Sequence, residues 1–288
     1  MTVRISSNQV LDAGVQAMDN SLIDAMAWQK KISSGNLYSK ASENPYAVSR
    51  GVRLEFDESR LEMYKLNRKI VESSHANGQT QLSSIIDEMN VLKQTFVQSQ
   101  NGALNSTNYA ALKIKVEQIR DAIENQMIAE DGTGKAIFSD TVNQVQIEPN
   151  ITVDSGIKFS DAFGDGASFD DPTSSDLYTS IDNFATYLDE MSSGDSLTNV
   201  ASTIESDLDD AFNLLTEAQQ RSGGISAQID LSTNAMLTVK TNIAAASSAL
   251  LDTNLAEATA GYTRAQTLLN AAQAMFARLQ QSSLFSKL

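Results

Sequence analysis

Residues 251–279, LDTNLAEATAGYTRAQTLLNAAQAMFARL, carry the strongest structural signal in this chain, because their apolar side chains recur every three or four positions. A repeat of about 3.5 residues is the pattern of a coiled-coil helix, whose narrow apolar stripe is buried against another helix. The members of the stripe are Leu251, Leu255, Ala258, Tyr262, Ala265, Leu269, Ala272, Phe276 and Leu279. This end of the chain is therefore predicted to be a long helix that requires a partner helix.

The other end of the chain carries a similar stripe between residues 11 and 32, in which Gln29 is the polar member. Its apolar members are Leu11, Val15, Met18, Leu22, Ala25 and Ile32. Neither terminal helix is apolar all round, so we predict that the two termini pair with each other. Paired helices of this kind are typical of proteins that assemble. The predicted assembly interface consists of Leu11, Val15, Met18, Leu22, Leu255, Tyr262, Leu269, Phe276 and Leu279.

Heptad spacing also covers most of the sequence between the two stripes. It predicts helices at residues 8–33, 47–100, 107–129, 175–191 and from about 197 onward. In the second of these helices, three seam positions carry residues that are poor substitutes for an apolar side chain: Arg68, His75 and Gly78. This predicts looser packing in the middle of that helix. The register slips by one position at 250/251, which predicts a break between two packed helical segments.

The helical period gives way to short alternating segments in the middle of the chain. Residues 135–138, 142–147 and 151–153 predict small strands or a hairpin, whereas 160–176, rich in Gly, Asp and Ser, predicts an irregular loop. The predicted fold is mainly α, an elongated rod of long helices with coiled-coil termini and a small inserted β-containing domain. The predicted domains are a terminal coiled coil (1–45 and 251–288), a helical bundle (46–130 and 197–250) and a small acidic β-containing domain (131–196).

The net charge of −15 is concentrated in the middle of the chain, where residues 131–217 contain 2 basic and 18 acidic side chains. No basic face is available for a phosphate backbone, which argues against nucleic acid as a partner. Cys is absent, which excludes disulfides and thiol chemistry. No apolar stretch is long enough to predict a membrane span, and the first residues lack the pattern of a cleaved signal peptide. If the protein is exported, we expect a route that removes no signal peptide.

Three segments resemble chemical sites, and each is better explained as structure. His75 is the single histidine and lies on a helix seam, so we expect a structural role. The run DGTGK at 131–135 lacks the first glycine of a phosphate-binding loop and the Ser or Thr after its lysine. The run DAFGDG at 161–166 resembles the start of a calcium loop, but Phe163 and Pro172 replace two of its ligands. We therefore predict no catalytic, cofactor-binding or metal-binding residues and no enzymatic activity.

Several short motifs, taken in order, resemble the bacterial flagellin family. Near the start are VRIS at 3–6 followed by Asn8 and Gln9, KISSG at 31–35, and SENPYA at 42–47. Inside the chain are GKAIFS at 134–139 and QQRSGG at 219–224, and near the end are LDTNLAEA at 251–258 and SLF at 283–285. The likeness covers about residues 1–145 and 197–288.

The resemblance implies a structural component of the bacterial flagellum, exported through the flagellum's own channel into the extracellular structure, with terminal helices that become protected on assembly. Two kinds of member fit: one that joins the hook to the filament, favoured by Pro45 and by the ending at 283–285, and the filament subunit itself, which the run TRAQ at 263–266 resembles. The implied partners are other copies in a ring, a neighbouring hook-associated protein, flagellin and an export chaperone, with no nucleic acid, membrane or cofactor. A binding module or a tail-like rod of bacteriophage type is the rival class.

Overall fold

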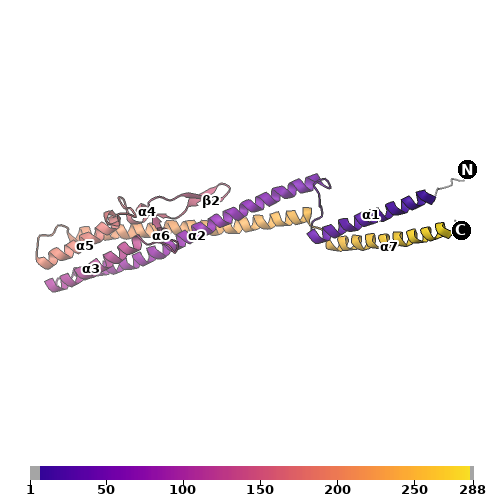
Figure 1. Ribbon diagram of the computed structural model, residues 1–288. Helices are drawn as coiled ribbons and strands as arrows, with labels where there is room; N and C mark the ends of the chain where they lie inside the picture. The colour runs from indigo at the N-terminus through magenta and orange to yellow at the C-terminus, as the bar shows by residue number, and fades with distance from the viewer. Residues whose placement is uncertain (1–6, 286–288) are drawn as a thin grey trace. The chain divides into compact units, whose positions relative to one another are not determined.

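The computed structural model describes residues 7–285 and shows a mainly helical chain, as predicted (Figure 1). Its long helices are α1 (Ser7–Ser34), α2 (Pro45–Ser99), α3 (Ser106–Met127), α5 (Asp176–Ser193), α6 (Ala201–Leu251) and α7 (Leu255–Phe285). The chain forms two compact units. The first contains the described residues up to Arg60 and those from Thr238 onward, and the second contains Leu61–Leu237.

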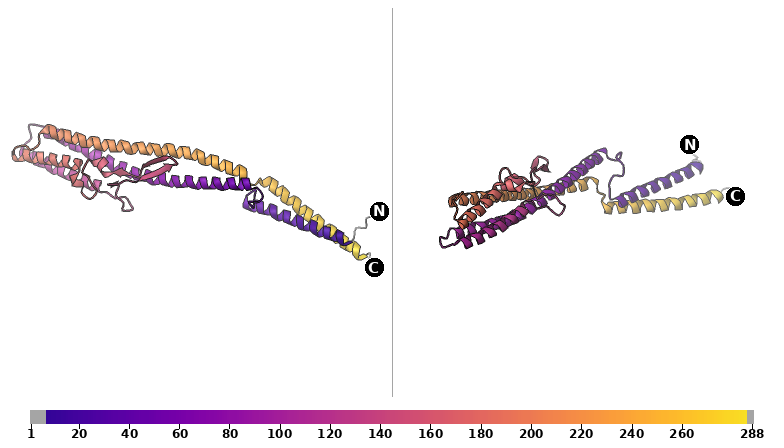
Figure 2. Two further views of the ribbon diagram at one scale, coloured as in Figure 1. Left: turned by 90° about the horizontal axis from the view of Figure 1, so that it is seen from above. Right: turned by 60° about the vertical axis from the view of Figure 1, so that its left-hand side comes forward.

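In the first unit, α1 and α7 run side by side in opposite directions, as the views in Figures 1 and 2 show. Ala25 of α1 and Ala258 and Ala265 of α7 are buried between them. Small side chains allow two helix backbones to approach closely but remove little apolar area from water. The predicted pairing of the two ends of the chain is therefore confirmed, and among the described residues the buried side chains of the pair are alanines.

The connections that follow α1 and α6 also lie against each other within the first unit. The backbone N–H of Leu37 donates to the carbonyl oxygen of Leu251 over 2.6 Å, and that of Thr253 donates to the carbonyl oxygen of Gly35 over 2.8 Å. Gly35 has a φ of +71°, in the left-handed region where a glycine ends a helix without strain. The Leu251 side chain lies against Gly51 of α2, where an added Cβ would be 2.5 Å from Leu251 Cδ1.

The break predicted from the register slip at 250/251 is confirmed, since α6 ends at Leu251 and α7 begins at Leu255. The side-chain oxygen of Asn254 accepts hydrogen bonds from the backbone N–H groups of Ala256 and Glu257. Asparagine is a favoured residue at helix starts because its side chain satisfies N–H groups that have no partner within the helix. The two helices are therefore separate elements, and α7 begins with its own cap.

The second unit is built around α2, α3, α5 and α6, which share one apolar core. Asn105 begins α3 by accepting a hydrogen bond from Asn108, and Ser175 begins α5 by accepting one from Tyr178. Large side chains fill this core, in contrast to the alanines of the first unit. Its fully buried members include Leu82, Ile85, Met89, Leu92, Val116, Leu177, Ile181, Phe184, Leu188, Ile204 and Leu215.

The β-containing segment lies within the second unit and consists of two small sheets. Strand β1 (Phe138–Ser139) pairs in parallel with β4 (Ile157–Lys158), and β2 (Gln144–Glu148) forms an antiparallel hairpin with β3 (Ile151–Asp154). After β4 come the short helix α4 (Phe159–Phe163) and a 3₁₀ turn, η1 (Pro172–Ser174). The predicted hairpin is present, but the interpretation of 160–176 as one irregular loop was wrong.

Aromatic packing explains why 160–176 contains a helix. Phe163 meets Phe138 and Phe159 edge to face, with ring centroids 4.8 Å apart in both pairs. All three rings are fully buried and belong to the same core as the bundle helices. The division of the chain into three domains remains a prediction. The structure groups 131–196 with the bundle and places the boundaries of the first unit after Arg60 and before Thr238.

The middle of α2 is closely packed, so the predicted looseness was wrong. Arg68 and His75 are buried, and a Cβ added at Gly78 would be 2.5 Å from Ile157 Cδ1. These residues break the apolar pattern because they meet the hairpin and β4 rather than only another helix. Among the described residues, no helix is both long and apolar enough to cross a membrane.

Candidate assembly interface

The contact between α1 and α7 is built from aromatic rings that lie on glycines of the opposite helix. Trp28 of α1 covers Gly261 of α7, where an added Cβ would be 2.6 Å from Trp28 Cε2. Phe276 of α7 lies over Gly14 of α1, where an added Cβ would be 3.3 Å from Phe276 Cδ2. The two contacts are reciprocal and far apart along the helices, so together they fix the register of the pair.

The structure divides the predicted interface residues into three groups. Met18, Tyr262, Leu269 and Phe276 are half-buried. Val15 and Leu22 are each 41% exposed and Leu255 is 57% exposed, so these three side chains remain largely open to solvent. The side chains of Leu11 and Leu279 lie outside the described residues.

The face that α1 turns toward α7 keeps Met18, Ala25 and Ile32 of the predicted stripe but differs from it by one position at the other described members. Gly14, Ser21 and Trp28 are half-buried where Val15, Leu22 and Gln29 were expected. A count of apolar residues overlooks Gly14 and Ser21, although a missing or short side chain is what allows the partner helix to approach. The largest side chain of the contact, Trp28, was the signal in the sequence that could have identified this face.

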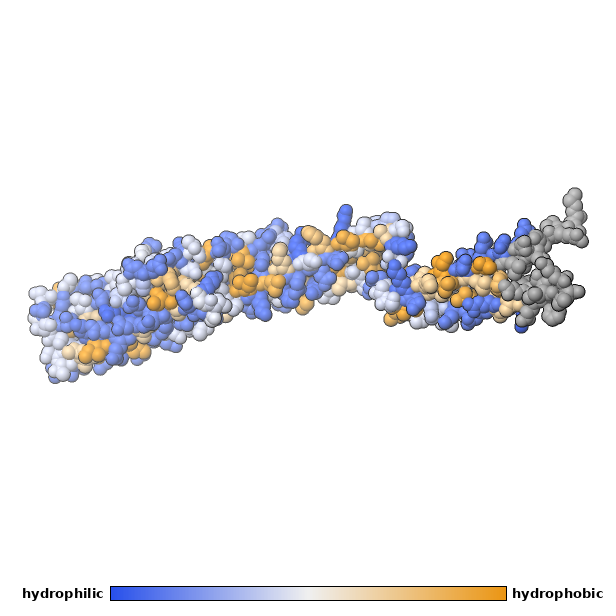
Figure 3. Space-filling model, viewed as in Figure 1, coloured by the Kyte–Doolittle hydropathy of each residue, from blue (hydrophilic) through white to orange (hydrophobic). Residues whose placement is uncertain are grey.

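Further apolar side chains of the first unit remain exposed. They come from α1, from α7 and from the first residues of α2, and Figure 3 shows apolar surface on these helices. Exposed apolar groups gathered on a small unit are typical of surfaces that bind another protein. These residues are Ile23, Met26, Tyr46, Val52, Phe56, Leu268 and Met275.

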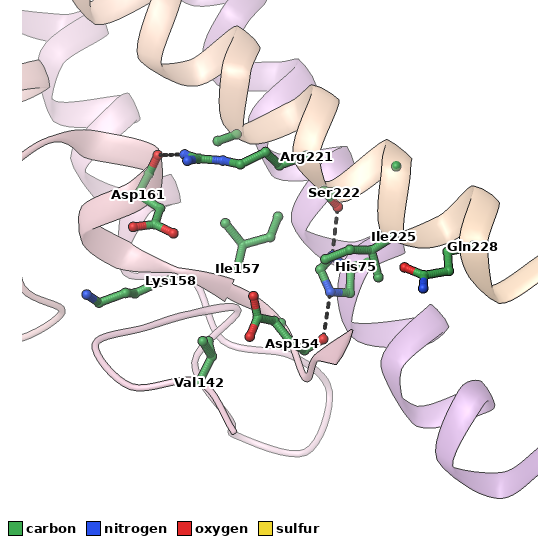
Figure 4. Close-up of a pocket in the computed structure, with 13 residues that line it drawn as sticks. His75, Val142, Asp154, Ile157, Lys158, Asp161, Arg221, Ser222, Ile225 and Gln228 are labelled. Atoms are coloured by element: carbon green, nitrogen blue, oxygen red, sulfur yellow. Dashed lines mark hydrogen bonds between the residues drawn. The ribbon is translucent and has the colours of Figure 1, made fainter. Parts of the chain in front are cut away.

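The second unit contains a cleft of about 290 Å³ between α6, the middle of α2 and the segment from β3 to α4 (Figure 4). Charged side chains of both signs line it: Asp154, Lys158, Asp161 and Arg221. Arg221 donates to the carbonyl oxygen of Asp161 over 2.8 Å and pairs with Glu217 over 3.7 Å. The hydrogen bond from Arg221 ties the segment to α6, and a lining of two acidic and two basic side chains does not form a strongly charged binding site.

The cleft also borders His75, which is buried and fully hydrogen-bonded. Its Nδ1 lies 2.9 Å from Ser222 Oγ and its Nε2 lies 3.1 Å from the carbonyl oxygen of Asp154. Burial lowers the pKa of His75, although the carbonyl and carboxylate of Asp154 partly oppose this. Neither nitrogen is directed at an empty space, and the structural role expected for His75 agrees with these contacts.

Of the two runs that resembled ligand sites, 161–166 spans the end of α4 and its C-cap Gly164, and 131–135 forms an ordinary turn. Asp131 Oδ1 accepts hydrogen bonds from the backbone of Thr133 and Lys135, which closes a turn completed by Gly134 at a φ of +79°. These contacts lower the pKa of Asp131, with the hydroxyl of Thr133 as the largest cause. Within the described part of the chain, no group of His, Asp and Glu side chains is arranged to hold a metal ion.

Two long regions of the chain match models of a known protein family. Its residues 5–143 match the bacterial flagellin N-terminal helical region, and residues 206–288 match the bacterial flagellin C-terminal helical region. The chain belongs to the bacterial flagellin family. The resemblance read from the sequence motifs is thereby confirmed, and the two matched regions contain both helices of the α1–α7 pair.

Among curated relatives, this flagellin-family chain is similar to two flagellar hook-associated proteins. Flagellar hook-associated protein 3 of Salmonella typhimurium strain LT2 is 25% identical over 137 residues, which cover 48% of this chain and 43% of the relative. The protein of the same name from Escherichia coli K12 is 23% identical over 137 residues, with the same coverage. The alignment spans less than half the length of these relatives.

Solved structures share the fold of the flagellin-family chain. A putative flagellar hook-associated protein from Vibrio parahaemolyticus matches with a TM-score of 0.62 and 19% identity over 73% of this chain and 100% of that chain. FlgL from Xanthomonas campestris matches with a TM-score of 0.55 and 14% identity over 66% of this chain and 99% of that chain. At these identities the likeness concerns the fold.

Proposed function

We propose that this flagellin-family chain is a non-enzymatic, hook-associated component of the flagellum that joins the hook to the filament. The observation that carries the proposal is that both curated relatives bear the name flagellar hook-associated protein 3. Two solved structures of the same fold are described as a hook-associated protein and as FlgL, which adds support. A connector requires surfaces that bind neighbouring subunits and no catalytic centre.

The α1–α7 pair is the assembly surface in this proposal. Val15, Leu22 and Leu255 belong to the interface predicted from the sequence, and their exposure in the single chain leaves them free to meet a neighbour. Met18, Tyr262, Leu269 and Phe276 complete the internal contact that holds the two helices in register. Apolar groups of both helices would be buried when subunits associate, which supplies a driving force for assembly.

The partners follow from the proposed position in the flagellum. Other copies of the chain form a ring, a second hook-associated protein lies on the hook side, and flagellin lies on the filament side. The chain reaches this extracellular position through the flagellar export apparatus, with a chaperone that covers the terminal helices before export. The exposed apolar residues of α1 and α7 support the need for such protection.

The filament subunit itself is the second candidate, because the matched family regions are those of flagellin. The two functions differ in where the protein lies and in how many copies are present. A junction protein occupies one short ring, whereas a filament subunit forms the bulk of the filament. Both use the same paired terminal helices.

Labelling of purified flagella with antibodies against this chain and gold particles distinguishes the candidates. Gold at a single position between hook and filament supports the junction, and gold along the whole filament supports the filament subunit. If neither intact nor dissociated flagella are labelled, while the same antibody binds the purified chain, both functions are contradicted. Deletion of the gene is expected to leave hooks intact and release filament protein into the medium, and a plasmid copy of the gene restores filaments.

A further inference from the structure

The hairpin formed by β2 and β3 is attached to α2 by three side chains that donate to its backbone carbonyl groups. Asn67 Nδ2 donates to Gln146 over 2.8 Å, Arg68 Nη1 donates to Ile147 over 2.9 Å, and His75 Nε2 lies 3.1 Å from the carbonyl oxygen of Asp154. Asn67 does not titrate and an arginine stays charged under all ordinary conditions, whereas a histidine changes charge near neutral pH. His75 is therefore the attachment that acid can alter.

The hydrogen bonds around His75 determine which of its nitrogens carries the proton. A carbonyl oxygen can only accept, so Nε2 must carry a hydrogen that it donates to Asp154. In the neutral ring Nδ1 is then the acceptor, and Ser222 Oγ donates to it over 2.9 Å. The same hydroxyl oxygen accepts from Gln79 Nε2 over 3.1 Å, and Gln79 also donates to Ser226 Oγ over 3.0 Å. While the imidazole is neutral, His75 Nε2, the hydroxyl of Ser222 and the amide of Gln79 each donate to an acceptor.

Protonation disturbs this arrangement at a buried position. A second ring hydrogen on Nδ1 would face the hydroxyl of Ser222, which now donates to that atom and would have to turn. His75 is 1% exposed, so the new positive charge would be removed from water. The charged groups lining the cleft beside it are Asp154 from β3, Lys158 from β4, Asp161 from α4 and Arg221 from α6. Two of these side chains are acidic and two are basic, and the carboxylate of Asp154, which favours the cation, only partly opposes the effect of burial.

The hairpin rests on only a small apolar cluster, so one hydrogen bond is a large part of what holds it on the helices. Val71 of α2, Ile229 of α6, and Ile147 and Val153 of the hairpin are its buried members, and they form a cluster separate from the main core. The main core of the second unit contains no residue of β2 or β3. The hairpin can therefore detach while the helices stay folded.

We propose that His75 is a protonation-sensitive latch, which holds the β2–β3 hairpin on α2 and α6 when neutral and releases it in mild acid. Figure 4 shows the imidazole between Ser222 of α6 and the backbone of Asp154, where it joins the three elements. The state with the hairpin detached exposes His75 to water and restores its ordinary affinity for protons. Acid therefore favours the detached state.

The direction of the pH dependence follows from the lowered pKa. The attached state binds the proton more weakly than the detached state, whose histidine titrates near its ordinary value of 6.5. Attachment is therefore at full strength above that pH and weakens as pH falls from 6.5 toward the lowered pKa. The equilibrium constant for attachment falls by at most about tenfold for each pH unit within this window.

Two measurements on the full chain test the latch. The imidazole signals of the single histidine are followed by NMR from pH 8 to pH 4.5, and amide hydrogen exchange of residues 144–154 is compared at pH 7.5 and 5.5 after correction for the intrinsic rate. We expect a titration midpoint below 6.5 and a loss of hairpin protection of up to about tenfold at pH 5.5, with the amides of α3 and α5 unchanged. A midpoint at or above 6.5, or equal hairpin protection at both pH values, overturns the proposal.

Two variants assign the effect to His75. In His75→Gln, which cannot titrate, the hairpin is expected to have the same protection at both pH values, whether that protection is high or low. In Glu88→Gln, which removes a different titratable group of α2 with a shifted pKa, the pH effect is expected to persist unchanged. A pH-dependent loss of protection in His75→Gln as large as in the unmodified chain would assign it to another group and overturn the proposal.

Discussion

Trp28 of α1 lies directly on Gly261 of α7, so close that a Cβ at residue 261 would be 2.6 Å, 2.8 Å and 2.9 Å from three atoms of the indole. Trp28 is the one tryptophan of the chain, and Lys31 Nζ lies 4.9 Å from the centroid of its ring on the same helix. The contact between the two terminal helices thus depends on glycine, which has no side chain, at residue 261 and on the large indole of Trp28.

Gly261→Ala is expected to destabilise the α1–α7 pair by about 1–3 kcal/mol, because the indole has to move to admit the methyl group. Trp28 fluorescence reports the change directly, and we expect emission at longer wavelength and a lower temperature for loss of the α1–α7 contact. Gly224→Ala in α6 is the matched control, since nothing lies within 4 Å of its added Cβ. In the control, replacement of a helical glycine is expected to be neutral or to stabilise by about 0.4–1 kcal/mol. Unchanged fluorescence in Gly261→Ala would contradict the contact.

Phe276→Asp and Met275→Asp separate the internal contact of the pair from its outer surface. Phe276 lies over Gly14, so a carboxylate there is expected to weaken the pairing of α1 with α7 and to block assembly. Met275 is exposed, so its replacement is expected to leave the pair intact and to weaken assembly alone. Helix content and protease protection of the monomer measure the first effect, and filament growth in a complemented deletion strain measures the second. Normal filament growth with Phe276→Asp would show that the pairing of α1 with α7 is not required.

The helices could be predicted from the sequence because their heptad spacing is local. Part of the α1 face was predicted one position away, because Gly14 and Ser21 contribute to the contact through their small size. The middle of α2 was misjudged for a different reason. His75 and Gly78 meet segments that are 79 residues away along the chain, namely the carbonyl of Asp154 and the side chain of Ile157. No periodicity within α2 contains that information.

The terminal helices are expected to be the first part of the isolated monomer that a protease cleaves. The buried side chains of their contact are alanines (Ala25, Ala258 and Ala265) and the larger ones, such as Trp28 and Phe276, are only half-buried, whereas the second unit has a core of large buried side chains. Little apolar area is then available to offset the entropy lost on ordering α1 and α7. Limited proteolysis with mass spectrometry is expected to show early cuts in α1 and α7 of the monomer and protection of the same bonds in purified flagella. Equal protection in the two states would show that the monomer alone holds its termini.

Glu88 provides a second test of how burial controls charge in this protein. Burial raises its pKa, while the hydrogen bond from Gln126 Nε2 to Glu88 Oε1, 2.8 Å long, partly opposes this. Glu88 Oε2 and Gln126 Oε1 are both buried without a hydrogen-bond partner. Each of these atoms is an acceptor while Glu88 is ionised, so a donor at Glu88 would improve the site.

Glu88→Gln is therefore expected to stabilise the protein at neutral pH, since an amide carries no charge and its NH₂ group supplies the missing donor. A raised pKa means that the folded state holds its proton more tightly than the unfolded state. The cost of ionisation thus appears as pH rises above the ordinary value of 4.5 and is complete once the raised pKa is passed. Urea unfolding midpoints of both proteins from pH 3.5 to 8 measure the difference, which we expect to grow with pH and then level off. An advantage for Glu88→Gln that is the same at pH 3.5 and pH 8 would show that the charge of Glu88 does not cause it.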